Sequence, residues 1–245
     1  MRIKIINPNT TKTMTDSIYM AAISCARSDT EIVAVSSNNG PESIENFYDQ
    51  HVSVIGLMEE IHNGIDENID AYIIAAACDP GLYVAREMVD APVIGIGEAA
   101  MHMASLVSAK FSIVTVLPRI VPLIEKAVEQ SGLSSKCASI RSINVCVLDT
   151  ENNPLLTETE LYKSCQQALE YDGAEAICLG CSGMTKFAEE LENKLGVPVF
   201  DGVIAAVKLA ESLVEMKKHN SKLLTFKNPT KKEYAGYVKG LEPKS

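Results

Sequence analysis

The sequence predicts an α/β fold made of two similar lobes with parallel sheets, related by internal duplication, with a site between them. Two observations predict it. Strand-length apolar runs alternate with helical patterns along the chain, which favours parallel sheets joined by right-handed crossovers. Residues 70–76 and 175–181 also share one pattern, in which an acid precedes an apolar run and a turn, and each is followed by a Pro-Val segment and an Ala-Ala pair. We therefore expect lobes at residues 1–108 and 109–216, and a basic tail at residues 217–245.

The first half alternates four strands with four helices. Residues 3–6 form a short apolar run that predicts a strand, and residues 11–26 follow with apolar side chains at helical spacing. The run at residues 72–76 is uninterrupted, as expected for a strand buried on both sides of a parallel sheet. The same criteria predict strands at 3–6, 31–35, 72–76 and 93–96, and helices at 11–26, 44–61, 82–89 and 98–108.

The second half repeats this order. It predicts strands at 111–117, 143–148, 176–179 and 197–200, and helices at 120–130, 158–170, 184–195 and 203–216. Ligands of open α/β sheets bind beyond the carboxyl ends of the strands. We therefore expect one cleft to be faced by the turns that follow Ile6, Val35, Ala76, Leu117, Leu148 and Gly180.

The composition, 47% apolar and 22% charged, is that of an ordinary globular protein. No run of about 18 uncharged apolar residues occurs, so we expect no membrane span. The net charge of −10 argues against nucleic acid as the main partner. Residues 217–245 hold eight Lys and two Glu, a net charge of +6, so the rest of the chain carries −16. We expect this tail to pack on the acidic body or to stay solvated.

Seven cysteines occur at irregular spacing. Cys178 and Cys181 form a CxxC pair, but no second pair of Cys or His follows at a matching distance, so no metal site is expected. We interpret the thiols as reduced and the compartment as cytoplasmic.

Cys181 stands at a predicted strand end, directly before a predicted helix. Backbone N–H groups at a helix start favour an anion, and the same field lowers the pKa of a cysteine. The alternative is that Cys181 is a small buried apolar residue, as most free cysteines are. The position alone leaves both interpretations open.

Five segments spread in order over most of residues 1–210 are Asn7-Pro8-Asn9-Thr10-Thr11 with Met14-Thr15, Gly40-Pro41-Glu42-Ser43-Ile44-Glu45, Asp79-Pro80-Gly81-Leu82, Gly95-Ile96-Gly97-Glu98-Ala99-Ala100-Met101, and Leu179-Gly180-Cys181-Ser182-Gly183-Met184. Taken together, they resemble the hydantoin racemase branch of the aspartate/glutamate racemase superfamily. The resemblance implies two Rossmann-like lobes with the active site between them and no cofactor. It also implies two cysteines flanking the substrate carbon, one removing a proton and the other supplying one from the opposite face. The implied substrates are 5-substituted hydantoins, allantoin among them.

On this resemblance Cys181 becomes a catalytic candidate. We expect a small-molecule substrate and a homo-oligomeric assembly. The residues expected to contact the substrate are Asn9, Thr10, Pro41, Ser43, Ala76, Ala77, Asp79, Gly97, Glu98, Ser182 and Gly183.

The first lobe departs from the family pattern, which places the other cysteine three residues before the Asp-Pro-Gly turn. Ala76 occupies that position here, and the nearby thiol is Cys78. The internal repeat independently matches Ala76 with Cys181. Two residues of extended chain span about 7 Å, whereas a general base must come within about 3 Å of its proton. Either the loop folds back to bring Cys78 to the substrate, or the site has one thiol.

We expect Cys78 to work opposite Cys181, because inversion needs a proton donor on each face. Two alternatives remain. With one cysteine, the protein would be a decarboxylase or isomerase of the same superfamily, which protonates one face of an enolate. It could also be a binding protein that kept the cleft and lost the chemistry.

Overall fold

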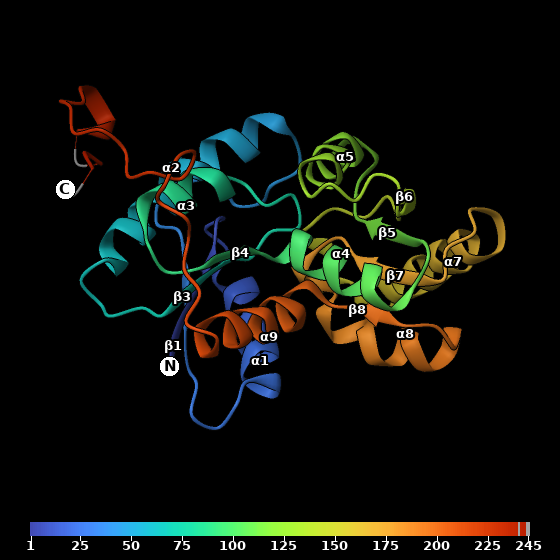
Figure 1. Ribbon diagram of the computed structural model, residues 1–245. Helices are drawn as coiled ribbons and strands as arrows, with labels where there is room; N and C mark the ends of the chain where they lie inside the picture. The colour runs from blue at the N-terminus through green and yellow to red at the C-terminus, as the bar shows by residue number, and fades with distance from the viewer. Residues whose placement is uncertain (240, 244–245) are drawn as a thin grey trace.

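The computed structural model describes residues 1–239 and 241–243, so Gly240, Lys244 and Ser245 of the predicted tail lie outside it. The described strands form two four-stranded parallel sheets in two adjacent lobes (Figure 1), which confirms the predicted fold class. The first sheet has the order β2-β1-β3-β4, from β1 (Arg2–Asn7), β2 (Glu31–Ser36), β3 (Ala71–Ile74) and β4 (Val93–Gly95). The second has the order β6-β5-β7-β8, from β5 (Phe111–Thr115), β6 (Cys137–Ser142), β7 (Ala176–Leu179) and β8 (Val199–Phe200).

The strands within each of the two sheets pair in the same register, as expected for a duplicated unit. β3 pairs with β1, and β7 pairs with β5, so that Ala71 in the first lobe corresponds to Ala176 in the second. Counting on along both strands makes Ala76 the structural counterpart of Cys181. The family pattern and the strand pairing thus agree that the first lobe carries alanine where the second carries cysteine.

The helices cover the sheets and connect successive strands. In the described residues no helix is long and apolar enough to cross a membrane. The α-helices are α1 (Lys12–Cys25), α2 (Phe47–Gly64), α3 (Leu82–Met88), α4 (Ile96–Val107), α5 (Val121–Gln130), α6 (Asp149–Asn152), α7 (Pro154–Tyr171), α8 (Ala188–Leu195) and α9 (Gly202–Glu215). The described part of the chain also forms three 3₁₀ helices, η1 (Pro118–Ile120), η2 (Ser182–Phe187) and η3 (Gly236–Val238).

The prediction of a strand at residues 143–148 was wrong. The strand in this part of the second lobe is β6, Cys137–Ser142. Asn144 has a left-handed backbone with φ of 55°, which interrupts regular pairing just after β6. Ile143, Val145 and Val147 are nonetheless buried. Their alternation reflects a segment that packs into the core beside β5 without forming a ladder.

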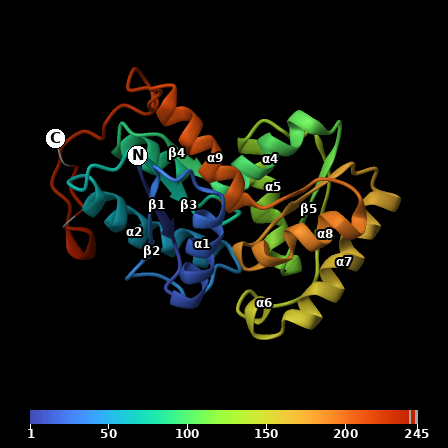
Figure 2. The same cartoon turned by 90° about the horizontal axis from the view of Figure 1, so that it is seen from below.

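Helices α4 and α9 tie the two lobes together. Ala100, Met101 and Ala104 of α4 are buried in the core of the second lobe, although α4 follows the first sheet in the chain. Val203 and Ala206 of α9 are buried in the core of the first lobe. Both views place α9 along the first lobe and α4 where the lobes meet (Figures 1 and 2). The boundary predicted at residues 108 and 109 therefore marks the sequence repeat, while the two halves exchange a helix in packing.

The basic tail begins by packing on the first lobe, at the end of α3. Lys222 Nζ donates to the carbonyl oxygens of Arg86 at 2.8 Å and Glu87 at 3.0 Å. These carbonyls belong to the last turn of α3, which leaves them without partners inside the helix. The Phe226 ring lies 5.8 Å from the Tyr83 ring, between centroids. Residues 222–226 thus hold α3 in place.

Candidate active site

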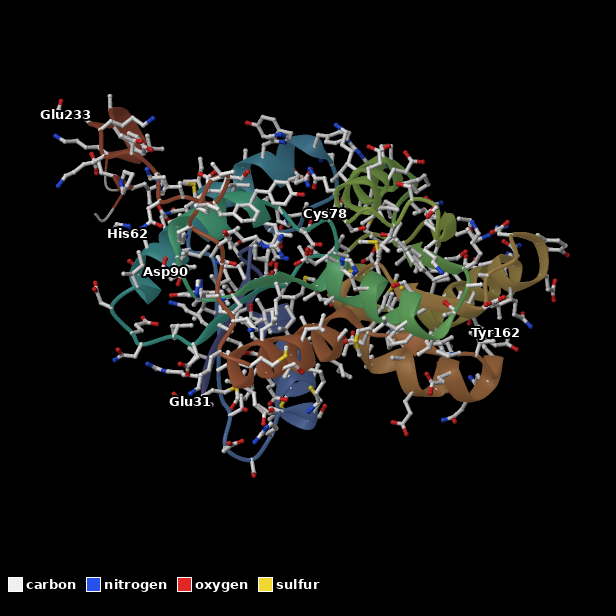
Figure 3. All side chains as sticks on the ribbon, viewed as in Figure 1. Glu31, His62, Cys78, Asp90, Tyr162 and Glu233 are labelled. Carbon is white, nitrogen blue, oxygen red and sulfur yellow. The ribbon has the colours of Figure 1, made fainter. Side chains whose placement is uncertain are left out.

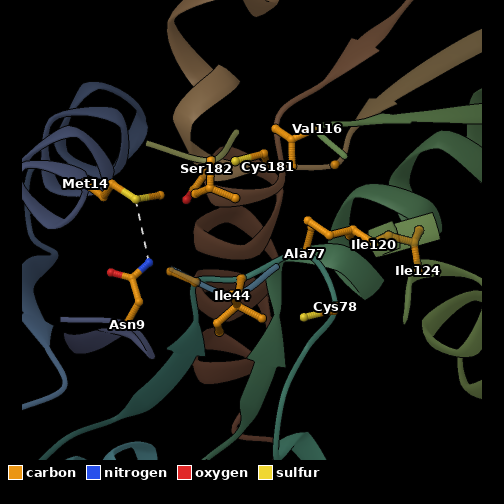
Figure 4. Close-up of a pocket in the computed structure, with 14 residues that line it drawn as sticks. Asn9, Met14, Ile44, Ala77, Cys78, Val116, Ile120, Ile124, Cys181 and Ser182 are labelled. Atoms are coloured by element: carbon orange, nitrogen blue, oxygen red, sulfur yellow. Dashed lines mark hydrogen bonds between the residues drawn. The ribbon is translucent and has the colours of Figure 1, made fainter. Parts of the chain in front are cut away.

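A pocket lies where the carboxyl ends of strands from both sheets meet, as expected for an open α/β protein. Cys78, labelled in Figure 3, is found where the lobes meet, whereas Glu31 and Tyr162 lie near opposite ends of the molecule. Turns after β1, β3, β5 and β7 all contribute to the pocket, and Figure 4 shows its lining. The lining residues are Asn9, Met14, Ile44, Ala75, Ala76, Ala77, Cys78, Val116, Ile120, Ile124, Val147, Gly180, Cys181 and Ser182.

Cys181 stands between β7 and η2 in a tightly packed turn. Its carbonyl oxygen accepts a hydrogen bond from Met184 N at 3.0 Å. A Cβ at Gly180 would lie 2.8 Å from Thr115 Cβ, and one at Gly183 would lie 2.3 Å from Thr150 Oγ1. Glycines on both sides therefore let the turn sit against β5 and α6. The start of the helix predicted at 184–195 was wrong. Residues 182–187 form a 3₁₀ helix, and α8 begins only at residue 188.

Cys78 reaches the same pocket because the chain bends back after β3. Asp79 N donates to the Ala76 carbonyl oxygen at 2.9 Å, and Asp79 has a left-handed backbone with φ of 45°. The turn thus compensates in part for the two-residue displacement from Ala76. Figure 4 shows Cys78 and Cys181 on different walls of the pocket, and each thiol comes from the corresponding turn of its lobe.

The pKa of the Cys78 thiol is raised to about 12. Burial is the main cause, and the neighbouring charges of Asp79 and Cys181 add to it. Cys78 is therefore protonated at neutral pH. In that state it is suited to giving a proton to a carbanion rather than to taking one from a weak carbon acid.

Asn9 provides an amide donor at the pocket wall. Its Oδ1 accepts from Asn7 Nδ2 at 2.8 Å and from Thr11 N at 2.9 Å, which fixes the orientation of the amide. Its Nδ2 points to Met14 Sδ at 3.6 Å (Figure 4), a weak acceptor. The amide thus keeps donor capacity that a carbonyl or enolate oxygen in the pocket could use.

Of the predicted binding residues, Asn9, Ala76, Ala77 and Ser182 line the pocket with the two cysteines, and the others do not. Thr10 N donates to the Pro41 carbonyl oxygen at 3.0 Å and so joins two loops. The Asp79 carboxylate accepts hydrogen bonds from the backbone N–H groups of Gly97 and Glu98, in the first turn of α4. Glu98 pairs with Arg86 and accepts from Gly95 N at 3.2 Å. Those that do not line the pocket are Thr10, Pro41, Ser43, Asp79, Gly97, Glu98 and Gly183.

The sequence patterns missed most of the apolar lining. Ile44 was expected inside a helix. Instead, Asn46 caps the start of α2, because its side chain accepts a hydrogen bond from Asp49 N at 3.0 Å. Ile44 therefore lies before the helix, where it lines the pocket. Ile120 and Ile124 are four residues apart and so share a face at the η1–α5 junction. That spacing was visible, but it does not distinguish a pocket wall from ordinary core. The described residues contain no group of three or more His, Cys, Asp or Glu side chains placed to hold a metal ion.

Comparison with known proteins identifies the family. A model of the Asp/Glu/Hydantoin racemase family matches residues 3–210. The chain belongs to this family. A hydantoin racemase from Pseudomonas sp. (strain NS671) is 51% identical over 236 residues, which cover 96% of this chain and 95% of that protein.

Two solved structures of family members are also similar throughout. An allantoin racemase from Klebsiella pneumoniae superposes with a TM-score of 0.96 at 42% identity, over 99% of both chains. An allantoin racemase from Pseudomonas fluorescens gives a TM-score of 0.94 at 37% identity, over 96% of this chain and 100% of that one. The chain is thus a racemase, and the expected family, fold and enzyme class are confirmed.

Proposed function

We propose that this racemase inverts C5 of 5-substituted hydantoins, with Cys181 and Cys78 moving the proton on opposite faces of the ring. The observation that carries the proposal is that thiols from the corresponding turns of the two lobes line one pocket. The C5 hydrogen of a hydantoin is acidified by the adjacent C4 carbonyl, because its removal gives an enolate. A reaction of this kind needs a base on one face and an acid on the other.

The proposed reaction starts with Cys181 as thiolate and Cys78 as thiol. The Cys181 sulfur takes the C5 proton, and the electron pair of the C–H bond moves into the C4 carbonyl as an enolate. Asn9 Nδ2 donates a hydrogen bond to the enolate oxygen. The Cys78 thiol then delivers its proton to the opposite face of C5. The product is the other enantiomer, and the enzyme is left with the reverse protonation, from which it can convert that enantiomer or return to the starting state by exchange with solvent.

No metal or cofactor enters this scheme, because the carbonyl of the substrate itself stabilises the charge. The test is to incubate one enantiomer of a 5-alkylhydantoin with the purified protein and a chelator, and to follow both enantiomers by chiral chromatography. We expect racemisation above the uncatalysed rate, unaffected by the chelator. Activity that disappears with the chelator and returns with a divalent ion would contradict cofactor independence. Solvent exchange with retention and no inversion would instead indicate one-sided chemistry.

The lining also predicts a preference among substrates. None of the lining residues is charged, and nine of them have apolar side chains. These nine are Met14, Ile44, Ala75, Ala76, Ala77, Val116, Ile120, Ile124 and Val147. The ureido group of allantoin would leave hydrogen-bonding groups unpaired against this wall, at a cost of about 1–3 kcal/mol for each group. We therefore expect kcat/KM for 5-isobutyl- or 5-benzylhydantoin to exceed that for allantoin by about tenfold or more. Equal or higher kcat/KM for allantoin, measured under the same conditions, would contradict this.

The raised pKa of Cys78 predicts an unusual pH profile. The pair of thiols works with one proton between them, so activity rises as the first thiol ionises and falls only when the second proton is lost. Because the pKa of Cys78 is about 12, kcat/KM should show no alkaline decline between about pH 8 and pH 10. The measurement requires a 3-methylated hydantoin, which lacks the acidic imide N–H. A decline in that range would show that Cys78 ionises much more easily than its burial implies.

A further inference from the structure

Asp79 holds the turn that carries Cys78, through contacts far away in the sequence. Its carboxylate accepts from Gly97 N at 2.9 Å and from Glu98 N at 2.7 Å, both in the first turn of α4. Asp79 is buried and does not line the pocket. The side chain next to Cys78 is therefore anchored to the start of α4.

The backbone around this anchor is packed with no space to spare. A Cβ at Gly97 would lie 2.1 Å from the Ala77 carbonyl oxygen, and one at Gly95 would lie 2.2 Å from the Asp79 carboxylate. Side chains at either position would push the turn away from α4. A second tether comes from α2, where Gln50 Nε2 donates to the Cys78 carbonyl oxygen at 3.3 Å.

The same turn has a constrained shape. Asp79 takes its left-handed backbone directly before Pro80, where an extended conformation is usual. Asp tolerates the left-handed region better than most residues. The hydrogen bond from Asp79 N to the Ala76 carbonyl oxygen closes the bend. An extended chain in its place would carry Cys78 about 7 Å beyond the level of Ala76.

From these contacts we infer that Asp79 is a positioning residue, which turns Cys78 back to the substrate and so replaces the thiol missing at Ala76. The inference rests on the proposed two-thiol reaction. Asp79 does not line the pocket, and it acts by fixing the backbone on both sides of Cys78.

The test uses Asp79→Gly, which permits the left-handed backbone but removes the carboxylate, and Asp79→Asn, which keeps one of the two acceptor oxygens. Racemisation should fall by at least about 10²-fold in the Gly variant, since a misplacement of about 1 Å has this effect, and less in the Asn variant. In D₂O, the enantiomer that Cys181 deprotonates should still exchange its C5 hydrogen with retention. A merely misfolded protein would lose that exchange as well. Adding Ala76→Cys to Asp79→Gly should restore racemisation.

A matched control is Asn153→Ala, which removes the residue capping α7 in the other lobe. It should lower thermal stability and leave racemisation unchanged. Wild-type racemisation by both Asp79 variants would overturn the inference while leaving the proposed function intact. Equal loss of racemisation and of one-sided exchange in the soluble Asn variant would also overturn it, because Asp79 would then support the whole pocket. Absence of racemisation in the wild-type protein would instead refute the proposed function.

Discussion

Replacing Cys181 by Ser is expected to lower kcat for hydantoin racemisation by about 10²- to 10⁴-fold, the usual contribution of a general acid or base. A hydroxyl has nearly the shape of a thiol but is a far weaker acid, so the variant lacks a usable base at C5. Since the two enantiomers of the substrate have equal free energy, kcat/KM must fall equally in both directions. Steady-state kinetics from each enantiomer measure this.

The control for Cys181→Ser is Cys146→Ser, which removes an exposed thiol outside the pocket. It should react like the wild-type protein. Near-normal turnover by Cys181→Ser would exclude Cys181 as a base, and Ser182 or another lining group would have to be considered.

Replacing Cys78 by Ala should lower the rate of racemisation by about 10³-fold or more, while proton exchange on the face served by Cys181 remains. Cys181 can still remove a proton from one enantiomer and return it to the same face. That enantiomer should therefore exchange its C5 hydrogen with solvent and keep its configuration, whereas the other should not exchange. Mass spectrometry of each recovered enantiomer measures both rates. Unchanged racemisation would exclude Cys78 as a catalyst.

The strand register supplies a sharper form of this experiment. Because Ala76 corresponds to Cys181, adding Ala76→Cys to Cys78→Ala places a thiol at the strand end in both lobes. Racemisation should recover by about tenfold or more over Cys78→Ala alone. Failure to recover, in a folded variant that still exchanges one enantiomer, would mean that position 76 is too far from the face that Cys78 serves.

The sequence repeat predicted the two lobes, the alternation of strands and helices along the chain and the mismatch at Ala76, because strand pairing preserves residue spacing. It could not predict the bend at Cys78. That bend depends on Asp79 reaching Gly97 and Glu98, a contact made only once α4 is packed beside the turn. Asp79 and Glu98, which the resemblance places among the substrate-binding residues, do not line the pocket, and Asp79 accepts a hydrogen bond from Glu98 N at the start of α4.

The exchange of α4 and α9 between lobes was also invisible in the sequence. Both helices are rich in small apolar residues, and their periodicity shows which face is buried but not which sheet covers it. Residues 143–148 were misread for a similar reason. Their alternation indicated burial correctly, but Asn144 adopts a left-handed backbone and ends regular pairing.

The claim that two thiols act on opposite faces is tested most directly by solvent isotope incorporation during the first few per cent of reaction. A single enantiomer of a 5-alkylhydantoin is incubated with the wild-type protein in D₂O. The two enantiomers are then separated, and the deuterium content of each is measured by mass spectrometry. With Cys181 and Cys78 as separate acids and bases, the product enantiomer should carry one deuterium, while the recovered starting enantiomer should still carry hydrogen. Deuterium that accumulates in the starting enantiomer as fast as product forms would show that one group serves both faces, and would contradict the two-thiol mechanism.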